Sequence, residues 1–275
     1  MGMFDELFNS LYADLPDKEK YLERIGMDSD VKPTKETLDA LILAHLRTVP
    51  FENLDVCDAD TDISLSIPHL YEKIVTNRRG GYCYELNAAF TALLKAVGFE
   101  CYPIAVRVVW GATRFMPISH RAAIVTIDGV RYFADVGFGG PSPQGALMID
   151  DPGEQPSGVN VFVVDKGGEH GIVINRLVDG KKEQLLMFKD TPVDPVDFLA
   201  LNEYQAKSKY SMFRIARLVN LVTEEGAKSL SGSVLKIYNY DIGDTSEMSF
   251  ESQEELRAAL KEHFDIDVDF TLKMG

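Results

Sequence analysis

Cys83 is the first residue of the chain whose type and position favour covalent chemistry. It follows Gly80-Gly81 and stands in the first turn of a predicted helix. Unpaired amide N–H groups at a helix N-terminus favour negative charge, so a thiol there ionises more readily and becomes a nucleophile. The two glycines allow a sharp backbone turn and a close approach of a substrate. The alternative is a cysteine that only packs in the core, as most free cysteines do.

A predicted β-hairpin brings a histidine and an acid onto one face of a sheet. Asp128-Gly129 lies between two apolar runs and is a strong signal for a two-residue turn. That turn places Asp135 opposite Ala122, two residues from His120 on the same strand. Diagonal neighbours on a sheet lie about 7–8 Å apart, which an imidazole and a carboxylate can bridge by a hydrogen bond. This register requires a hairpin without a bulge, and an ordinary surface or core histidine is the alternative.

These three residues together supply a nucleophile, a base and a group that orients the base. That combination is typical of enzymes that transfer acyl groups through a covalent intermediate. No single motif among them decides the matter. The sequence therefore predicts a catalytic site made of Cys83, His120 and Asp135.

The first hundred residues have the periodicity of helices. Apolar residues recur at helical spacing in 33–48, where Thr34 is the predicted N-cap, and again in 82–97, which Gly98 ends. A shorter helix is predicted over 67–75. This pattern predicts a helical part over residues 1–98 that carries the nucleophile.

Beyond Gly98 the pattern changes to strands. We expect a strand over 101–109, the hairpin at 128–129 and a second hairpin at Asp179-Gly180, with an extended connection over 141–158. The last third is mixed: 210–222 and 233–238 resemble strands, and a capping box at Ser252 opens a helix that runs to about His263. The prediction is an α+β chain in three parts: a helical bundle (1–98), an antiparallel β-barrel or sheet with His120 and Asp135 (99–195), and an α/β end (196–275).

Composition and charge exclude several classes of function. The 275 residues include 45% apolar and 26% charged residues, which is ordinary for a globular protein, and the net charge is −15. Nucleic-acid binding and anionic membranes are disfavoured by that charge. Three cysteines without a CxxC pair predict neither a disulfide framework nor a metal site. An acidic start and the lack of a run of about 20 apolar residues predict a cytoplasmic protein.

The chain resembles the arylamine N-acetyltransferases in five segments that occur in the same order along both sequences. RGGxC and DVGFG are the most specific pieces of the match. The five segments are AHLRTVPFENLDV (44–56), RRGGYCYELN (78–87), SHRAAIV (119–125), YFADVGFGG (132–140) and NEYQAKSKYSMF (202–213).

The resemblance implies both a fold and a reaction. The fold is a helical bundle, a β-barrel and an α/β lid, related to papain-like and transglutaminase-like enzymes. The reaction is a ping-pong transfer in which acetyl-CoA acetylates the cysteine before an arylamine or hydrazine accepts the acetyl group; no metal is implied. Three alternatives use or retain the same site: a thiol hydrolase, an amide synthase with a longer acyl donor, and a non-catalytic homologue that binds a ligand.

Position by position, the resemblance also implies roles for individual residues. Cys83 is the nucleophile, His120 the base and Asp135 its partner. Arg79 resembles a buried structural arginine paired with Glu52. The residues implied to line the acyl pocket or to lie near the cofactor are Phe51, Phe138, Gly139 and Tyr204.

A second hypothesis about the cofactor concerns the basic residues near Tyr204. They are Lys207, Lys209, Arg214 and Arg217. We expect some of them to meet the phosphates of acetyl-CoA, because charge-assisted hydrogen bonds to phosphate are strong. The alternative is a solvated basic surface. The sequence leaves the acceptor amine and the oligomeric state open.

Other residues near these motifs have weaker signals. His45 lies on the apolar stripe of its helix and is interpreted as a core histidine. Trp110 either shapes the pocket or packs a turn. Arg121 departs from the family pattern, in which the residue after the histidine is more often uncharged. The predicted register directs the Arg121 side chain away from the catalytic site.

Overall fold

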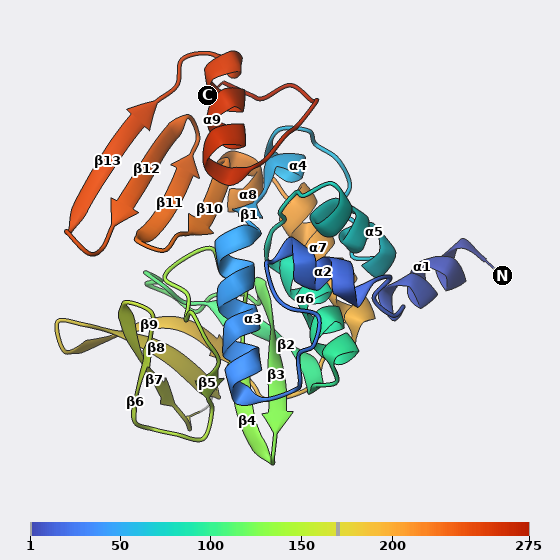
Figure 1. Ribbon diagram of the computed structural model, residues 1–275, viewed down its shortest axis with the longest axis vertical. Coiled ribbons are helices and arrows are strands. Elements are labelled where there is room, and N and C mark those ends of the chain that lie inside the picture. Colours follow the sequence, from blue (N-terminus) through green and yellow to red (C-terminus); the bar gives the residue numbers. More distant parts are fainter. Residues whose placement is uncertain (1, 169–170, 275) are drawn as a thin grey trace.

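The computed structural model describes residues 2–168 and 171–274 (Figure 1). The N-terminal part is helical except for one short strand. Its elements are α1 (Met3–Leu11), α2 (Lys18–Arg24), α3 (Lys35–Thr48), β1 (Phe51–Glu52), α4 (Leu54–Cys57), α5 (Ile67–Tyr71), the π-helical η1 (Glu72–Thr76) and α6 (Cys83–Val97).

The two principal helices begin and end where their sequences predict. Thr34 caps α3, since its hydroxyl accepts a hydrogen bond from the Thr37 N–H at 3.3 Å. Gly98 ends α6 in the left-handed region, with φ of 104°. All residues from Cys83 to Thr91 are buried, so α6 is a central helix rather than a surface one. It therefore fixes whatever its first turn carries.

An antiparallel eight-stranded sheet forms the second part. Its order is β5-β4-β3-β2-β9-β8-β7-β6. The strands are β2 (Glu100–Val108), β3 (His120–Ile127), β4 (Val130–Ala134), β5 (Leu147–Met148), β6 (Glu154–Ser157), β7 (Asn160–Asp165), β8 (Ile172–Val178) and β9 (Lys181–Phe188). Both predicted hairpins are confirmed, because residues 128–129 and 179–180 have positive φ and the strands pair directly beside them. The 141–158 connection contains the short strands β5 and β6.

This sheet curls into a nearly closed barrel. Gln155 of the edge strand β6 bonds with its side chain to the backbone of Met148 on the opposite edge strand, β5. Its Oε1 accepts from the Met148 N–H at 2.7 Å, and its Nε2 donates to the Met148 carbonyl at 2.9 Å. The interior is filled by apolar side chains that include Ile104, Ile124 and Phe133. Closure protects two strand edges that would otherwise be exposed.

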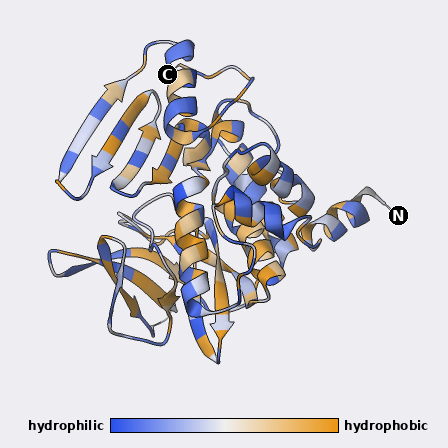
Figure 2. Cartoon of the chain, viewed as in Figure 1, coloured by the Kyte–Doolittle hydropathy of each residue, from blue (hydrophilic) through white to orange (hydrophobic). Residues whose placement is uncertain are grey.

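The last part combines short helices with a five-stranded sheet. Its elements are η2 (Pro195–Asp197), α7 (Phe198–Lys207), α8 (Met212–Ile215), β10 (Leu218–Val222), β11 (Gly226–Ser231), β12 (Val234–Asn239), β13 (Asp244–Ser249) and α9 (Gln253–Phe264). Helix α9 begins at the predicted Ser252 capping box and packs against the sheet (Figure 1). The edge strand β13 is exposed along its whole length and largely hydrophilic (Figure 2), as suits an unpaired edge.

The prediction of a single strand over 210–222 is wrong for its first half. Residues Met212–Ile215 form the helix α8, and only Leu218–Val222 is a strand. The amide of Asn53 explains the difference, because its Nδ2 donates to the carbonyls of Phe213 and Ala216, both at 2.8 Å. This contact comes from a segment distant in sequence, so local periodicity does not reveal it.

Strand β1 joins the N-terminal part to the C-terminal sheet. Phe51 pairs with Asn220 of β10, and the Glu52 N–H donates to the Gly81 carbonyl at 2.8 Å. The α+β fold with helices, barrel and a second sheet is thus confirmed, whereas the division of the chain at residues 98 and 195 stays a prediction. Within residues 2–168 and 171–274, no helix has the length and apolar character needed to cross a membrane.

We expect Gln155→Ala to destabilise the barrel by about 1–3 kcal/mol, since the N–H and the carbonyl of Met148 would both lose their hydrogen bonds to the Gln155 side chain at a partly buried edge. Chemical denaturation followed by circular dichroism measures the change. Gln184→Ala, at an exposed position of β9, is the control and should change stability by less than about 0.5 kcal/mol. Equal effects of both substitutions would contradict a closing role for Gln155.

Candidate active site

The double glycine before Cys83 is required by close packing rather than by an unusual backbone conformation. A Cβ on Gly80 would lie 1.9 Å from the Pro50 carbonyl oxygen, and one on Gly81 would lie 2.9 Å from the Glu85 side chain. Neither glycine has positive φ; in this loop Arg78 does, at 52°. Strand β1 and helix α6 therefore hold this loop from two sides.

Cys83 is the first residue of α6, and its side chain is enclosed. The residue is 2% exposed, and Sγ lies 3.7 Å from the Ser119 carbonyl oxygen. The segment after Asp135 covers the helix start, since a Cβ on Gly137 would lie 2.9 Å from Cys83 Cα. Cys83 therefore lies at a helix N-terminus, as predicted. Its side chain is buried beneath the segment that follows Asp135.

His120 and Asp135 make the contact predicted from the hairpin register. His120 Nε2 lies 2.6 Å from Asp135 Oδ2, and both side chains are buried. The Cys83 thiol lies close enough to the imidazole to raise the pKa of His120. Since Nε2 bonds to the acid, Nδ1 is the ring nitrogen left for the thiol. The structure thus brings the three residues together in the order thiol, imidazole, carboxylate.

The environment of His120 favours its protonated form. Burial lowers the pKa of His120, but the charge of Asp135, the hydrogen bond to that carboxylate and the neighbouring Cys83 outweigh burial and raise the pKa to about 10. The ordinary value is about 6.5. An imidazolium beside the sulfur stabilises a thiolate, which is the nucleophilic form of cysteine.

Asn87 completes the site and was not predicted as a functional residue. It lies one turn after Cys83 on α6, so both face the same side of the helix. Its Nδ2 donates to Asp135 Oδ1 at 2.9 Å and to the Arg121 carbonyl at 2.6 Å, and its Oδ1 accepts from the Val136 N–H at 3.1 Å. The Cys-x-x-x-Asn spacing was the available signal. Asn87 fixes the acid relative to the helix that carries the thiol.

A buried network of charges lies on the other side of the helix start. The predicted pairing of Arg79 with Glu52 is confirmed, at 2.7 Å, and Arg79 also bonds to Asp55 at 2.8 Å. Lys73 bonds to Asp55 at 2.7 Å and to Glu85 at 2.6 Å. Burial outweighs the influence of Lys73 and raises the pKa of Glu85 to about 7. These residues support the loop before Cys83 and do not contact the thiol.

Aromatic side chains surround the site where the acyl pocket was expected. The Phe138 ring lies 6.0 Å from the His120 ring, measured between centroids. Gly139 has φ of 69°, and a Cβ there would lie 2.9 Å from the Phe51 ring. Phe51 and Gly139 also line a cavity of about 260 Å³ between the barrel and the C-terminal sheet.

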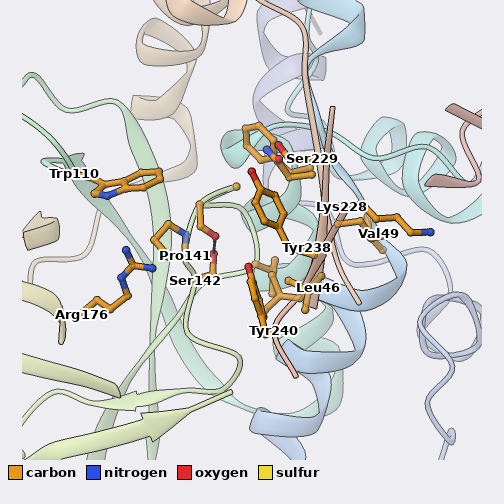
Figure 3. Close-up of a pocket in the computed structure, with 18 residues that line it drawn as sticks. Leu46, Val49, Trp110, Pro141, Ser142, Arg176, Lys228, Ser229, Tyr238 and Tyr240 are labelled. Carbon is orange, nitrogen blue, oxygen red and sulfur yellow. Dashed lines mark hydrogen bonds between the residues drawn. The ribbon is translucent and has the colours of Figure 1, made fainter. Parts of the chain in front are cut away.

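Figure 3 shows the two walls of this cavity. Trp110 and Arg176 lie on the barrel side, whereas Tyr238 and Tyr240 come from the C-terminal sheet. Trp110 thus lines the pocket, and its Nε1 donates to Glu183 at 3.1 Å. Lys228 contributes its aliphatic stem, because its ammonium is directed away and bonds to the His263 carbonyl at 3.3 Å.

Comparisons with known proteins match nearly the whole chain. A family model described as N-acetyltransferase matches residues 34–273. An arylamine N-acetyltransferase of Mycolicibacterium smegmatis is 32% identical over 254 residues, covering 90% of this chain and 91% of the relative. Human arylamine N-acetyltransferase 1 is 30% identical, covering 92% of this chain and 94% of the relative.

The chain belongs to the arylamine N-acetyltransferase family. It is therefore an acyltransferase. Among solved structures, Mycobacterium marinum arylamine N-acetyltransferase in complex with CoA superposes with a TM-score of 0.80 at 28% identity, covering 91% of this chain and 93% of that one. A solved structural relative of this acyltransferase thus binds CoA.

The residues expected to meet the cofactor of this acyltransferase lie apart from the cavity in Figure 3. Tyr204 is 51% exposed on α7. Lys207 pairs with Asp62 at 2.5 Å, and Arg214 pairs with Asp60 at 2.6 Å. The remaining basic residues differ from these: Lys209 lies over the Tyr210 ring, and Arg217 is buried with Asp58. The cofactor contacts therefore stay a prediction, except that Arg217 has a structural partner.

The other residues interpreted from sequence occupy packing positions in the acyltransferase. His45 is fully buried and bonds to the Tyr21 hydroxyl at 3.0 Å, so its core role is confirmed. Burial raises the pKa of Cys101 to about 11 and also raises that of Cys57. Arg121 points away from the catalytic site, as predicted, and packs on the Phe198 ring.

We expect Asp135→Asn to move the alkylation of Cys83 to higher pH. Without the carboxylate, burial dominates and lowers the pKa of His120, so the imidazole is neutral near pH 7 and no longer favours the thiolate. The rate with iodoacetamide near neutral pH should fall at least about tenfold, because a neutral imidazole no longer favours the reactive thiolate. Mass spectrometry of the alkylated peptides over a pH series measures this rate.

Cys57 and Cys101 serve as internal controls in the same experiment, since burial raises the pKa of both thiols. Their slow alkylation should be unaffected by the substitution. An unchanged pH profile for Cys83 would contradict the role assigned to the carboxylate.

Proposed function

We propose that the chain transfers an acetyl group from acetyl-CoA to an aromatic amine or hydrazine through an acetylated Cys83. One observation carries this proposal: His120 is hydrogen-bonded to the buried carboxylate of Asp135 at 2.6 Å and neighbours the thiol of Cys83. Membership of the family and a relative in complex with CoA support the donor and the class of acceptor. The reaction is a ping-pong sequence of two half-reactions.

In the first half-reaction, the Cys83 thiolate attacks the carbonyl carbon of the acetyl thioester. A new C–S bond forms, and the bond to the CoA sulfur breaks. The departing CoA thiolate takes the proton held by His120. The Cys83 N–H, at the first position of α6, is free of hydrogen bonds within the described residues and is suited to stabilise the oxyanion.

In the second half-reaction, the amine nitrogen attacks the acetyl carbon on Cys83. His120, now neutral, accepts the proton that the nitrogen loses, and Asp135 stabilises the resulting imidazolium. The C–S bond breaks, the amide leaves and the thiolate–imidazolium pair is restored. Each proton taken from the amine in one turnover is thus available for the next CoA leaving group.

The surroundings of Cys83 favour transfer to an amine over transfer to water. Phe51, Phe138 and Gly139 are proposed to hold the acyl group, and the two rings are mostly enclosed. An apolar enclosure reduces the access of water to the thioester while it accepts a flat aromatic ring. The remaining candidates are a thiol hydrolase, which would release acetate, and an amide synthase, which would require a longer acyl donor.

Intact-protein mass spectrometry after brief incubation with acetyl-CoA should detect one acetyl group, and peptide mapping should assign it to Cys83. Addition of an aromatic amine such as aniline should discharge it with formation of the amide. Cys83→Ala should remain unmodified, whereas Cys101→Ala should react normally. Rapid release of acetate without an amine would favour the hydrolase, and reaction only with longer acyl donors would favour the synthase.

The cofactor phosphates are proposed to meet Tyr204, Lys207, Lys209 and Arg214. Phe213, beside Arg214, contacts the Phe51 ring at 6.1 Å between centroids, so this surface lies close to the acyl pocket. The carboxylates that now pair with Lys207 and Arg214 are exposed. Exposed ion pairs contribute about 0–1 kcal/mol, so a phosphate can displace them at little cost.

We expect a Lys207→Ala, Lys209→Ala double variant to raise the KM for acetyl-CoA several-fold while kcat changes little. Lys236→Ala is the matched control, since Lys236 is also an exposed lysine paired with an acid, Glu247. Steady-state kinetics with a fixed aromatic amine measures both constants. An unchanged KM in the double variant, together with a raised KM in Arg176→Gln, would contradict this proposal. It would indicate that the phosphates bind at the wall of the cavity that Arg176 lines.

A further inference from the structure

A second cavity lies on the opposite face of β3 from the catalytic histidine. It has a volume of about 330 Å³ and is enclosed by the segment after α1, one side of α6, and the starts of α5 and η2. Its surface is about half polar and half apolar, and the apolar part comes from residues that include Leu11, Leu15, Ile67, Ala88, Ala92 and Pro103. Cavities of this size accommodate small ligands.

Arg121 supplies a positive charge to this cavity. Successive side chains of a strand point to opposite faces, so His120 faces the catalytic site and Arg121 faces α6. Arg121 is only 3% exposed, and it lines the cavity. Its Nε has no hydrogen-bond partner, and the Arg121 side chain forms neither an ion pair nor a hydrogen bond with any residue within 2–168 or 171–274.

Within the described chain the guanidinium packs on one ring, and the charge of Cys83 also favours its protonated form. The Phe198 ring centroid lies 4.5 Å from Arg121 Cζ, a distance suited to a cation–π interaction. That contact uses the flat face of the guanidinium, whereas its N–H donors lie in the plane at the edge. Burial lowers the pKa of Arg121 to about 10, which still leaves the group charged near neutral pH.

A buried charge without a partner is expensive, and proteins normally provide a counter-ion. The other charged residues that line this cavity are Asp14 and Lys95, and both are exposed to solvent. Neither residue forms an ion pair within residues 2–168 and 171–274. They have opposite signs, so the interior keeps the charge of Arg121.

We propose that this cavity binds a small monocarboxylate with an apolar body, whose carboxylate is held by Arg121. The planar fork of a guanidinium matches a carboxylate in two parallel hydrogen bonds. One interior cation balances one negative charge, which favours a monocarboxylate over a phosphate dianion. The apolar walls formed by α6 and the segment after α1 enclose the body of the ligand. The site does not depend on the reaction proposed for Cys83.

Isothermal titration calorimetry with hexanoate, in buffer low in chloride, tests this site. We expect saturable binding of one hexanoate per chain and no binding of hexanol, which has the same body without the charge. Arg121→Gln should weaken binding at least about tenfold, because the charged hydrogen bonds are lost. Arg131→Gln is the control, since Arg131 is ion-paired on the surface with Asp150, and it should bind like the unmodified protein.

Two further variants separate this cavity from other sites on the chain. Ala92→Phe reduces the cavity volume while leaving the charge of Arg121 in place, and it should also abolish binding. Protein alkylated at Cys83 should bind hexanoate normally, because the acyl pocket is blocked while this cavity is open. Binding that survives Arg121→Gln, or that is lost on alkylation of Cys83, would overturn the proposal.

Thermal unfolding supplies a readout that does not involve activity. Hexanoate should raise the unfolding temperature of the unmodified protein but not that of Arg121→Met. Without ligand, Arg121→Met should unfold at the same temperature as the unmodified protein or at a higher one, since a buried unpaired charge is removed. The remaining alternative is that Asp14 swings inward as the counter-ion. Hexanoate binding that appears only in Asp14→Asn would establish this alternative and overturn the ligand site.

Discussion

The buried carboxylate of Asp135 is the constraint on which the candidate active site depends. It accepts hydrogen bonds from three directions: the imidazole of His120 at 2.6 Å, the amide of Asn87 at 2.9 Å and the N–H of Gly137 at 2.8 Å. A buried charge requires such partners. Because the three donors come from β3, from α6 and from the chain after β4, satisfying one carboxylate fixes the barrel against the helix that carries the thiol.

The start of α6 is held just as firmly from the opposite side. Gly80 and Gly81 allow β1 and the first turn of α6 to approach closely, and Glu85 accepts from the N–H of Tyr82 at 3.1 Å. Strand β1 in turn pairs with β10, so the C-terminal sheet is tied to the loop that precedes Cys83. The enzyme therefore cannot be understood as three independent parts. Cys83 lies where all of them meet.

Local features of the sequence were sufficient for much of this arrangement. The turn at 128–129 determines the register of its hairpin, and that register alone brings His120 to Asp135. Helix ends at Thr34 and Gly98 follow from the chemistry of the capping residues. What could not be predicted depends on contacts between distant segments. The helix α8 requires the amide of Asn53, and the pairing of β1 with β10 links residues that no periodicity connects.

The alternation of side chains along β3 also explains how two chemically different environments lie one residue apart. His120 faces an acid and a thiol, which together make its positive charge favourable. Arg121 faces a ring and apolar walls, which do not. A neutral residue would fill the second environment at lower cost. Its arginine is therefore not explained by packing, and a buried guanidinium without a hydrogen-bonded ion pair favours a negative ligand in the cavity beside it.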